Sequence, residues 1–408
     1  MTLRIRHLAH VNPGTLAFDA LAPSAELTFM PLETVWADAR LDTSRFAIKA
    51  DVSSGYVRFQ DGDVLVPKTA PTFQHARATV IRGLTNGLGA GSSELHLLRP
   101  RSGSDARFLA YVTRSATFVA QGVASYQGVA GLQRVPADFV ANWPITSFTR
   151  EEQQRIADFL DDQVDRIDRA VALRHRQSEL LTNALSSAAE RLLVGGGATD
   201  QRQVPLRRLV RSIKTGATPT PEQQWVWVEG EDASSGLAWL SPASFSGSTL
   251  SLGPATKYID RQAASLFPRF GANSTVVIGI GATAGRVAHL DEDATGNQQL
   301  TCLEPSEAVV PRYLTWSLWC RQTTMRATAP FTTLPIINNE TLRALEISHP
   351  SRADQERMIE ELDERADHVG LARRHMDRWI SVAQERKQAL ITAAVTGQFD
   401  VTTARAVA

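Results

Sequence analysis

The stretch QQRIADFLDDQVDRID (residues 153–168) returns 202 residues later as QERMIEELDERADHVG (residues 355–370). Longer blocks match in the same way without gaps, at offsets of 202 and 205. They are residues 132–196 with 334–398, and residues 91–113 with 296–318. This tandem copy predicts two equivalent units related by an approximate twofold. Two equivalent units favour two-sided recognition over a single catalytic centre.

Apolar residues in the repeated segment step by four and three, which is the spacing of a coiled-coil seam. Such a seam needs a partner to stay dry, and the simplest partner is the other copy in antiparallel orientation. The alternative is an amphipathic helix packed on its own domain. Gly370 weakens the second helix by roughly 1 kcal/mol relative to Ala. The predicted seam residues are Leu160, Val164, Ile167, Val171, Leu181, Leu185, Leu362, Val369, Met376, Ile380 and Leu390.

Each long helix follows a segment that reads as a β-rich unit, and Gly195–Gly197 ends the first helix as a flexible link. The sequence therefore predicts an α+β fold: two β-rich domains separated by two long helices that pair as an antiparallel coiled coil, in a pseudo-twofold tandem duplication. Short apolar runs between Gly, Pro and Ser mark the expected strands. These strands are 64–66, 94–98 and 108–112, then 275–280, 299–303 and 313–318.

Composition limits the class of protein. The sequence has no run of 18 apolar residues and no signal-like start, which favours a cytoplasmic protein. Its two cysteines, Cys302 and Cys320, have no paired metal spacing, so we expect neither a disulfide scaffold nor a metal site. The net charge is zero, although residues 1–150 hold 15 Lys and Arg against 11 Asp and Glu, or +4. That balance is only weak evidence for a nucleic-acid partner.

Motifs for catalysis are missing from the sequence. The stretch Val276–Gly285 resembles a dinucleotide fingerprint, but its last glycine is one residue late and a second short strand follows, so a tight hairpin is expected. Its Thr283 and Arg286 would project from that turn. The chain has no phosphate-binding loop for nucleotide hydrolysis and no Asn/Asp-Pro-Pro-aromatic loop for base methylation. The acidic runs Asp161-Asp162 and Asp291–Asp293 are interpreted as solvated.

Polar side chains gather in the loops of both units. Arg, Lys, Gln and Asn can contact base edges, and Ser and Thr can hold phosphates. We therefore expect a DNA-binding role for one set of residues in each unit. In the first unit they are Lys68, Thr69, Gln74, His75, Arg77, Arg82, Gln121, Ser125, Tyr126 and Gln127. In the second they are Lys214, Thr218, Thr283, Arg286, Asn297, Arg326, Thr332 and Thr333.

Four stretches carry a resemblance to a known family. They are EQQRIADFLDDQVDRID (152–168), its copy at 354–367, KTGATP (214–219) with Asn297-Gln298, and the ending QALITAAVTGQFDV (388–401). Over nearly its whole length the chain resembles the specificity (S) subunit of type I restriction-modification systems. It departs from the family pattern at the end of the first helix (Leu193–Gly196) and at His10–Thr15, which lacks the Thr-Gly-x-Thr-Pro pattern.

The resemblance implies target-recognition domains at residues 1–150 and 198–350. It also implies conserved helical regions at residues 151–197, with the glycine linker, and at 351–408, with the C-terminal tail. Each domain would read one half of a bipartite DNA target while the helices set an unread spacer. Two methyltransferase subunits would supply S-adenosylmethionine chemistry on adenine N6, and a motor subunit would add translocation and cleavage with ATP and Mg²⁺. The chain itself would hold no cofactor and catalyse nothing.

Two other classes stay open at this stage. The first is a duplicated coiled-coil scaffold that binds proteins and has no DNA specificity. The second is an enzyme whose site does not follow a known motif. Salt-sensitive, sequence-dependent DNA binding together with the methyltransferase separates the DNA-recognition hypothesis from the scaffold. Turnover of S-adenosylmethionine by the chain alone would favour the enzyme.

Overall fold

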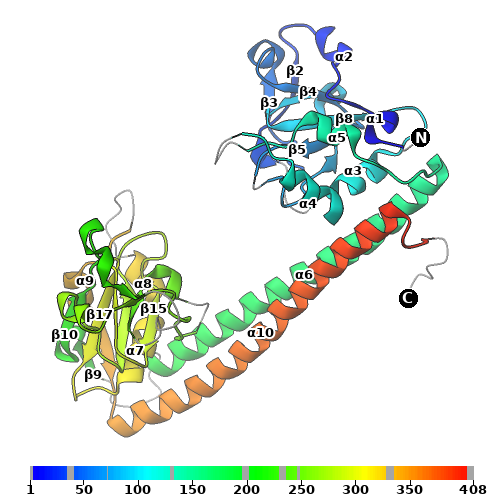
Figure 1. The fold of residues 1–408 in the computed structure, drawn as a ribbon. Helices are drawn as coiled ribbons and strands as arrows, with labels where there is room; N and C mark the ends of the chain where they lie inside the picture. The colour runs from blue at the N-terminus through cyan, green and yellow to red at the C-terminus, as the bar shows by residue number, and fades with distance from the viewer. Residues whose placement is uncertain are drawn as a thin grey trace. The chain divides into compact units, whose positions relative to one another are not determined.

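The computed structural model describes residues 3–34, 41–70, 72–128, 133–194, 202–228, 236–245, 249–327 and 335–401 (Figure 1). The chain divides into two compact units. Unit 1 comprises Met1–Arg174 and Asp377–Ala408, and unit 2 comprises His175–Met376. Both boundaries fall inside the long helices, so each unit includes one part of each helix. The expected linker Gly195–Gly197 lies outside the described residues.

Unit 1 contains two four-stranded sheets. The first has the order β1-β8-β5-β6 and is antiparallel throughout. The second has the order β3-β2-β7-β4, in which β2 and β7 are parallel. The strands are β1 (Ala9–Val11), β2 (Glu26–Met30), β3 (Phe46–Ile48), β4 (Val57–Gln60), β5 (Val64–Pro67), β6 (Thr79–Val80), β7 (Leu88–Gly91) and β8 (Leu95–Pro100).

Unit 2 repeats this arrangement. Its antiparallel sheet β10-β17-β14-β15 matches the first sheet of unit 1, and β12 lies parallel to β16 as β2 does to β7. A further pair, β9 and β18, is antiparallel. The strands are β9 (Arg202–Pro205), β10 (Val210–Thr215), β11 (Trp227–Val228), β12 (Leu237–Leu240), β13 (Tyr258–Ile259), β14 (Ser274–Ile278), β15 (Val287–Leu290), β16 (Ala294–Gly296), β17 (Leu300–Pro305) and β18 (Glu346–His349).

The copied glycines Gly91 and Gly296 end the second strand of each parallel pair. A Cβ on Gly91 would lie 2.3 Å from the Met30 carbonyl oxygen, and a Cβ on Gly296 would lie 2.9 Å from the Phe270 ring. Backbone and a buried ring occupy the space that a side chain would need. The repeat therefore preserves glycine here because the strands and core approach too closely for any other residue.

Two expected strands are helices. Residues 108–112 lie in α3 (Ala106–Arg114), and residues 313–318 lie in α7 (Pro311–Trp319). Both helices pack on a sheet, and the runs 108–112 and 313–318 are too short for their periodicity to separate a helix from a strand. The strand prediction was wrong for this reason. The other short helices are α1 (Ile5–Leu8), α2 (Leu16–Asp19), α4 (Ala116–Ala124), α5 (Ala137–Asn142), α8 (Gln322–Ala327) and α9 (Asn339–Ala344).

The long helices α6 (Arg150–Leu193) and α10 (Arg352–Thr396) pair within each unit. In unit 1, Leu160 and Ile391 share one core and Lys387 forms a 2.6 Å ion pair with Asp168. Residue numbers rise along α6 while those of its partner fall, so the pair is antiparallel. In unit 2, Leu185 and Leu362 share a core. The predicted fold class is confirmed, and every predicted seam residue is buried or half-buried.

The sequence marks where both long helices begin. Thr149 and Glu152 form a capping box before α6: Thr149 N donates to Glu152 Oε2 at 2.7 Å, and Glu152 N donates to Thr149 Oγ1 at 3.2 Å. Before α10, Asp354 N likewise donates to Ser351 Oγ at 3.2 Å, while the Ser351 hydroxyl donates to Asp354 Oδ2 at 2.6 Å. Gly370 does not interrupt α10, which continues from Arg352 to Thr396. Across the described residues, no helix is both long and apolar enough to cross a membrane.

Candidate functional site

The hairpin loops of the two units occupy equivalent places. In unit 1 residues 68–78 join β5 to β6, and in unit 2 residues 279–286 join β14 to β15. The first residue of each loop makes the same contact: Val135 N donates to Lys68 O at 2.9 Å, and Ile337 N donates to Gly279 O at 2.8 Å. The dinucleotide-like stretch is therefore a hairpin, as predicted.

In each unit a turn also contacts the hairpin loop: residues 92–94 before β8 in unit 1, and residues 297–299 before β17 in unit 2. Lys68 N donates to Glu94 O at 2.8 Å in unit 1, and Gly279 N donates to Gln299 O at 2.7 Å in unit 2. We call these assemblies the loop edges. The unit 1 loop edge comprises residues 68–70, 72–78, 92–94, 121–128 and 133–135; the unit 2 loop edge comprises residues 279–286, 297–299, 322–327 and 335–337.

Most predicted residues of unit 1 lie on its loop edge. Gln74, His75, Gln121 and Gln127 are exposed. The half-buried ones are Lys68, Thr69, Arg77, Ser125 and Tyr126. The two predicted polar loops, 67–82 and 114–131, are thus brought together through their described residues, 72–78 and 121–128, as a shared binding surface requires.

Sequence reasoning missed the residue that holds this loop. Phe73 is buried, with its ring 5.8 Å from Phe118 and 6.1 Å from Tyr126. It lies over Gly122, where an added Cβ would be 2.3 Å from Phe73 Cζ. A single aromatic between two exposed polar stretches was the available signal. Because Phe73 is buried, it fixes the backbone position of the next two residues, Gln74 and His75.

An ion pair that the sequence did not reveal also organises this edge. Arg134 donates to both carboxylate oxygens of Glu94 at 2.7 Å, and this bond lowers the pKa of Glu94. Lys68 donates to Ser93 O at 2.8 Å; burial lowers the Lys68 pKa, and the nearby Glu94 charge opposes that effect. The edge therefore presents more cationic than anionic groups.

Unit 2 gathers a different set of side chains at its loop edge. Thr283 and Arg326 are exposed, and half-buried Arg286 lies 6.0 Å from the Phe245 ring centroid. Helix α8 packs on the loop at Gly285, where an added Cβ would lie 3.0 Å from Gln322 O. Thr332 and Thr333 lie outside the described residues.

The motifs KTGATP and Asn297-Gln298 contact each other beside this edge. Ala217 N donates to Gly296 O at 2.7 Å, and Thr218 hydrogen-bonds Gln298. Asn297 is buried, donates to Gln299 Oε1 at 3.0 Å and accepts from Gln299 N at 3.1 Å. Asn297 thus holds the turn that carries Gln298, whereas Thr218 stays exposed.

Two predicted residues lie elsewhere. Lys214 points along β10 to Glu304, with a 2.7 Å ion pair at the end of β17 opposite the 297–299 turn. Arg82 is exposed beyond the end of β6 and lines a separate pocket with Arg107 and Arg114. Both residues were predicted from their charge alone. Their positions along β10 and after β6 place them away from the loop edges.

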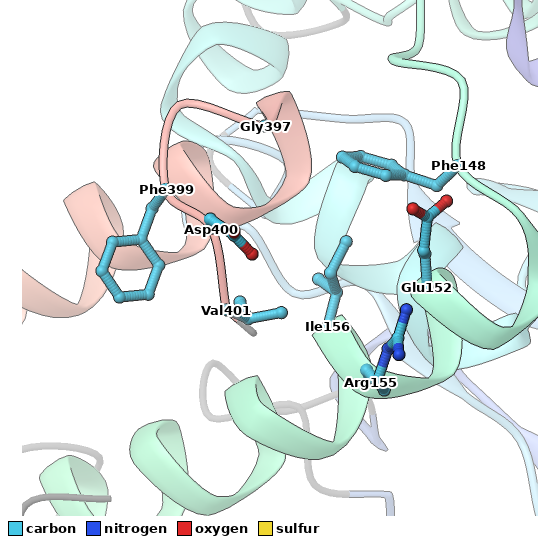
Figure 2. Close-up of a pocket in the computed structure, with 8 residues that line it drawn as sticks. All are labelled: Phe148, Glu152, Arg155, Ile156, Gly397, Phe399, Asp400 and Val401. Atoms are coloured by element: carbon cyan, nitrogen blue, oxygen red, sulfur yellow. The ribbon is translucent and has the colours of Figure 1, made fainter. Parts of the chain in front are cut away.

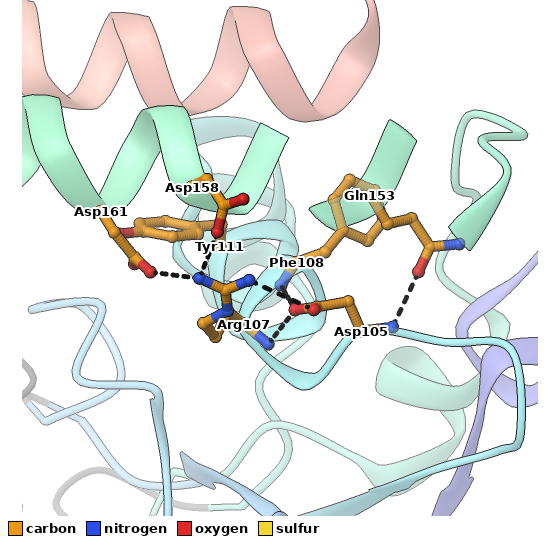
Figure 3. A network of polar contacts seen from close by, with 7 residues as sticks. All are labelled: Asp105, Arg107, Phe108, Tyr111, Gln153, Asp158 and Asp161. Carbon is orange, nitrogen blue, oxygen red and sulfur yellow. Dashed lines mark hydrogen bonds and ion pairs between the residues drawn. The ribbon is translucent and has the colours of Figure 1, made fainter. Parts of the chain in front are cut away.

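The repeated polar residues hold each unit to its long helix (Figure 3). Buried Gln153 accepts from Asp105 N at 3.0 Å and donates to Phe148 O at 3.0 Å. Its copy Gln355 makes the equivalent bonds to Val310 N and Pro350 O, at 2.9 and 3.0 Å. Both amides pair backbone groups that would otherwise be buried without partners.

An acidic residue completes this connection. Asp161 accepts from Arg107 at 2.8 Å and from the Tyr111 hydroxyl at 2.7 Å. Its copy Asp363 accepts from Arg312 at 2.5 Å and from the Trp316 indole at 2.8 Å. The interpretation of Asp161 as merely solvated was wrong, because α3 places two donors against that face of α6. Asp293, in the other acidic run, pairs with Arg269.

A cavity of about 300 Å³ lies in unit 1 between the first turns of α6 and the segment after α10 (Figure 2). Phe399 N donates to Ala393 O at 3.1 Å, so the chain folds back after Gly397, and the Phe399 ring lies 5.6 Å from that of Phe159. The charged groups that line it are Glu152, Arg155 and Asp400, without a hydroxyl, thiol or imidazole beside them.

The described residues offer little for metal binding or for catalysis by a cysteine thiol. Within the part of the chain that the structure describes, no group of three His, Cys, Asp or Glu side chains could hold a metal ion. Cys302 and Cys320 are buried free thiols, and burial raises the pKa of each to about 12. Such thiols are poor nucleophiles near neutral pH.

Comparison with known proteins gives a consistent result. Residues 246–369 match the family described as the type I restriction modification DNA specificity domain. The EcoAI type I restriction enzyme specificity subunit of Escherichia coli is 34% identical over 156 residues, which is 37% of this chain and 26% of that protein. The EcoEI specificity subunit of Escherichia coli is 31% identical over 173 residues, 40% of this chain and 28% of that protein. The chain thus matches about a quarter of each curated relative's length.

A solved structure shares the fold. It comes from work on complex assembly and conformational transition of the type I R-M system, covers 98% of both chains and has a TM-score of 0.73 at 17% identity. The resemblance to type I specificity subunits that the sequence motifs indicated is confirmed.

Proposed function

We propose that this chain, which carries a type I restriction modification DNA specificity domain, is the DNA-recognition subunit of a type I complex. Each loop edge would read one half of a bipartite target. The observation that carries this proposal is that equivalent segments of both units present different polar side chains. Gln74, His75 and Gln127 occupy one edge, and Thr283, Arg286 and Arg326 the other. Because side chains specify bases in the grooves, the two half-sites would differ.

The proposed role is non-catalytic. Two methyltransferase subunits would supply S-adenosylmethionine and the adenine N6 chemistry, and a motor subunit would supply cleavage driven by ATP with Mg²⁺. This chain would bind double-stranded DNA and these subunits, and would hold neither cofactor. A protein-interaction scaffold without DNA specificity is not favoured, because the similarity is to DNA specificity subunits.

Methylation mapping tests the recognition role. In a host that expresses the chain with its methyltransferase, we expect a modified motif of two unlike halves with a fixed gap. Replacing Gln74 and His75 together with Ala should alter one half and leave the other half and the gap unchanged, since both lie on the unit 1 edge. The matched change Thr283→Ala with Arg326→Ala should alter only the other half. A contiguous motif, or no motif, would contradict the proposal.

The long helices are proposed to set the gap. Adding seven residues, one heptad, to α6 after Arg174 and to α10 after Met376 keeps the seam in phase. At ~1.5 Å per residue this adds about 10 Å. Since duplex DNA rises about 3.4 Å per base pair, the gap should lengthen by about three base pairs while both halves stay the same. An unchanged gap in the mapped motif would count against this role of the helices.

A further inference from the structure

A second cavity in unit 1, of about 240 Å³, lies between β6 and α3. Three arginines line it: Arg82 beyond the end of β6, and Arg107 and Arg114 on α3. Tyr111 and Asp161 complete its polar lining together with Thr79. Because β6 begins where the hairpin loop 68–78 ends, the cavity adjoins the unit 1 loop edge.

The charges of the three arginines are satisfied to different degrees. Arg107 is ion-paired with Asp158 at 2.7 Å and with Asp161 at 2.8 Å. Arg82 is exposed to solvent. Arg114 is only 8% exposed, and its guanidinium lies 5.0 Å from the Tyr111 ring centroid. Among the residues that the structure describes, none accepts a hydrogen bond from that guanidinium or forms an ion pair with it.

The Arg114 side chain is mostly covered but lines the cavity, and its guanidinium has no anionic partner among the described residues, so it is available to an anionic ligand there. A guanidinium fork matches the oxygens of a phosphate in two parallel hydrogen bonds. Arg82, at the mouth of the same cavity, adds a second positive charge. The acidic groups present are already bonded to Arg107 and Tyr111, which leaves Arg82 and Arg114 to face an incoming anion.

Unit 2 lacks this site. At the offset of 205 the counterparts of Arg107 and Arg114 are Arg312 and Trp319. The counterpart of Arg82 is Asp291, because Val80 pairs with Val64 in unit 1 as His289 pairs with Thr275 in unit 2. Two of the three cations are therefore replaced, one of them by an acid. The cavity is a property of one unit and not of the repeated frame.

We propose that the cavity of Arg82, Arg107 and Arg114 binds a backbone phosphate of the duplex beside the half-site read by unit 1. This inference rests on the proposed DNA-recognition function and deepens it. The contact would position the duplex without reading its sequence, since phosphates carry no base identity. Free phosphate shares the same chemistry and is the second source that an experiment must separate.

DNA binding by the full chain, measured by fluorescence anisotropy at several salt concentrations, tests the site. Arg114→Gln and Arg82→Gln should each weaken binding about tenfold at physiological salt, equally for target and non-target duplexes, and should lower the salt slope by about one. Arg114→Lys should recover part of the affinity because it restores the charge but not the fork. The matched control is Arg101→Gln, an exposed arginine just after β8 that does not line the cavity, which should leave the slope near that of the unaltered chain.

A second measurement uses inorganic phosphate alone. At equal ionic strength, phosphate should raise the unfolding temperature of the unaltered chain relative to chloride, and Arg114→Gln should abolish the rise. If the chain binds DNA but both glutamine variants keep its affinity and slope, the site proposal is wrong and the function stands. If phosphate stabilises the chain while DNA binding stays unaltered in the variants, the cavity takes free phosphate instead.

Three further outcomes are equally decisive. If the unaltered chain binds no DNA even together with its methyltransferase, the proposed function fails, and an absent phosphate effect would then overturn the cavity as an anion site as well. Should Arg114→Gln fail to fold because it loses its contact with Tyr111, exposed Arg82→Gln decides the matter. An effect of Arg101→Gln as large as that of Arg82→Gln would reduce the result to net charge and contradict a built site.

Discussion

Gly216→Ala is expected to destabilise unit 2 by about 3 kcal/mol or more. A Cβ at this position would lie 2.2 Å from Gly296 O and 2.3 Å from Asn297 O. Both obstacles are backbone atoms, so no side-chain rotation relieves them. The chain would have to separate from the 296–298 turn and lose the hydrogen bonds of Gly216 N to Leu300 O (3.0 Å) and of Ala217 N to Gly296 O (2.7 Å). Urea denaturation measures the loss.

Gly14→Ala is the matched control. Gly14 stands 202 residues before Gly216, at the same place after the first strand of the equivalent sheet. An added Cβ there meets no atom within 4 Å, so the free energy of unfolding should change little. In methylation mapping, partly folded Gly216→Ala should relax the half-site of unit 2 alone. Equal urea midpoints for the two variants would show that the close approach at Gly216 is not what fixes this motif.

The long helices were predictable because their signal is redundant. The four-three step of apolar residues occurs twice, and both copies end up buried or half-buried along α6 and α10. Charged residues at seam positions do not spoil it: Lys387 is paired with Asp168, and Arg174 lies 5.4 Å from the Trp379 ring centroid. A pattern sustained over many turns outweighs a few exceptions.

The helices α3 and α7 were not predicted, because the apolar runs 108–112 and 313–318 are too short for their periodicity to separate a helix from a strand. Their capping residues held the missing information. The Asp105 side chain accepts from the backbone N of Arg107 and Phe108, and Pro311 stands in the first turn of α7. Both are common at helix starts and uncommon inside strands. These capping residues therefore indicate helices at both places, where the apolar runs alone do not.

The candidate site was predictable in place but not in detail. The sequence indicated two polar loops in unit 1 and a comparable set of polar residues in unit 2, and the unit 1 loops do meet at one edge. It could not separate exposed Gln74 from Lys68, which is partly buried beside Glu94, or from Lys214, which is paired with Glu304. Residue type predicts what a side chain can bind, whereas pairing across the fold decides whether it remains available.

Acidification is expected to destabilise unit 1 through His96. This side chain is buried beside the loop edge, with Nε2 2.9 Å from Val135 O and Nδ1 3.2 Å from Asn12 Nδ2. A carbonyl only accepts, so Nε2 carries the proton, and Nδ1 accepts from the Asn12 amide. Burial lowers the His96 pKa to about 4; the bond to Val135 O opposes this shift, and the Lys68 charge adds to it.

The direction of the pH effect follows from which state binds the proton. Below about pH 6.5 the unfolded chain protonates this histidine while the folded chain keeps it neutral, so acid favours unfolding. Stability is complete above pH 6.5, falls as the pH drops, and stops falling near pH 4, where the folded state protonates too. The shift from 6.5 to about 4 corresponds to about 3 kcal/mol over that window.

His96→Gln should remove most of this loss, because an amide can still donate to Val135 O and has no charge to acquire. Urea denaturation at pH 7 and pH 4.5 measures the difference between the two stabilities, which should be smaller in His96→Gln by about 2 kcal/mol or more. His75→Gln removes an exposed imidazole from the same edge and should leave the difference unchanged. If His96→Gln loses as much stability on acidification as the unaltered chain, some other group is responsible, and the buried neutral imidazole is not the source of the acid sensitivity.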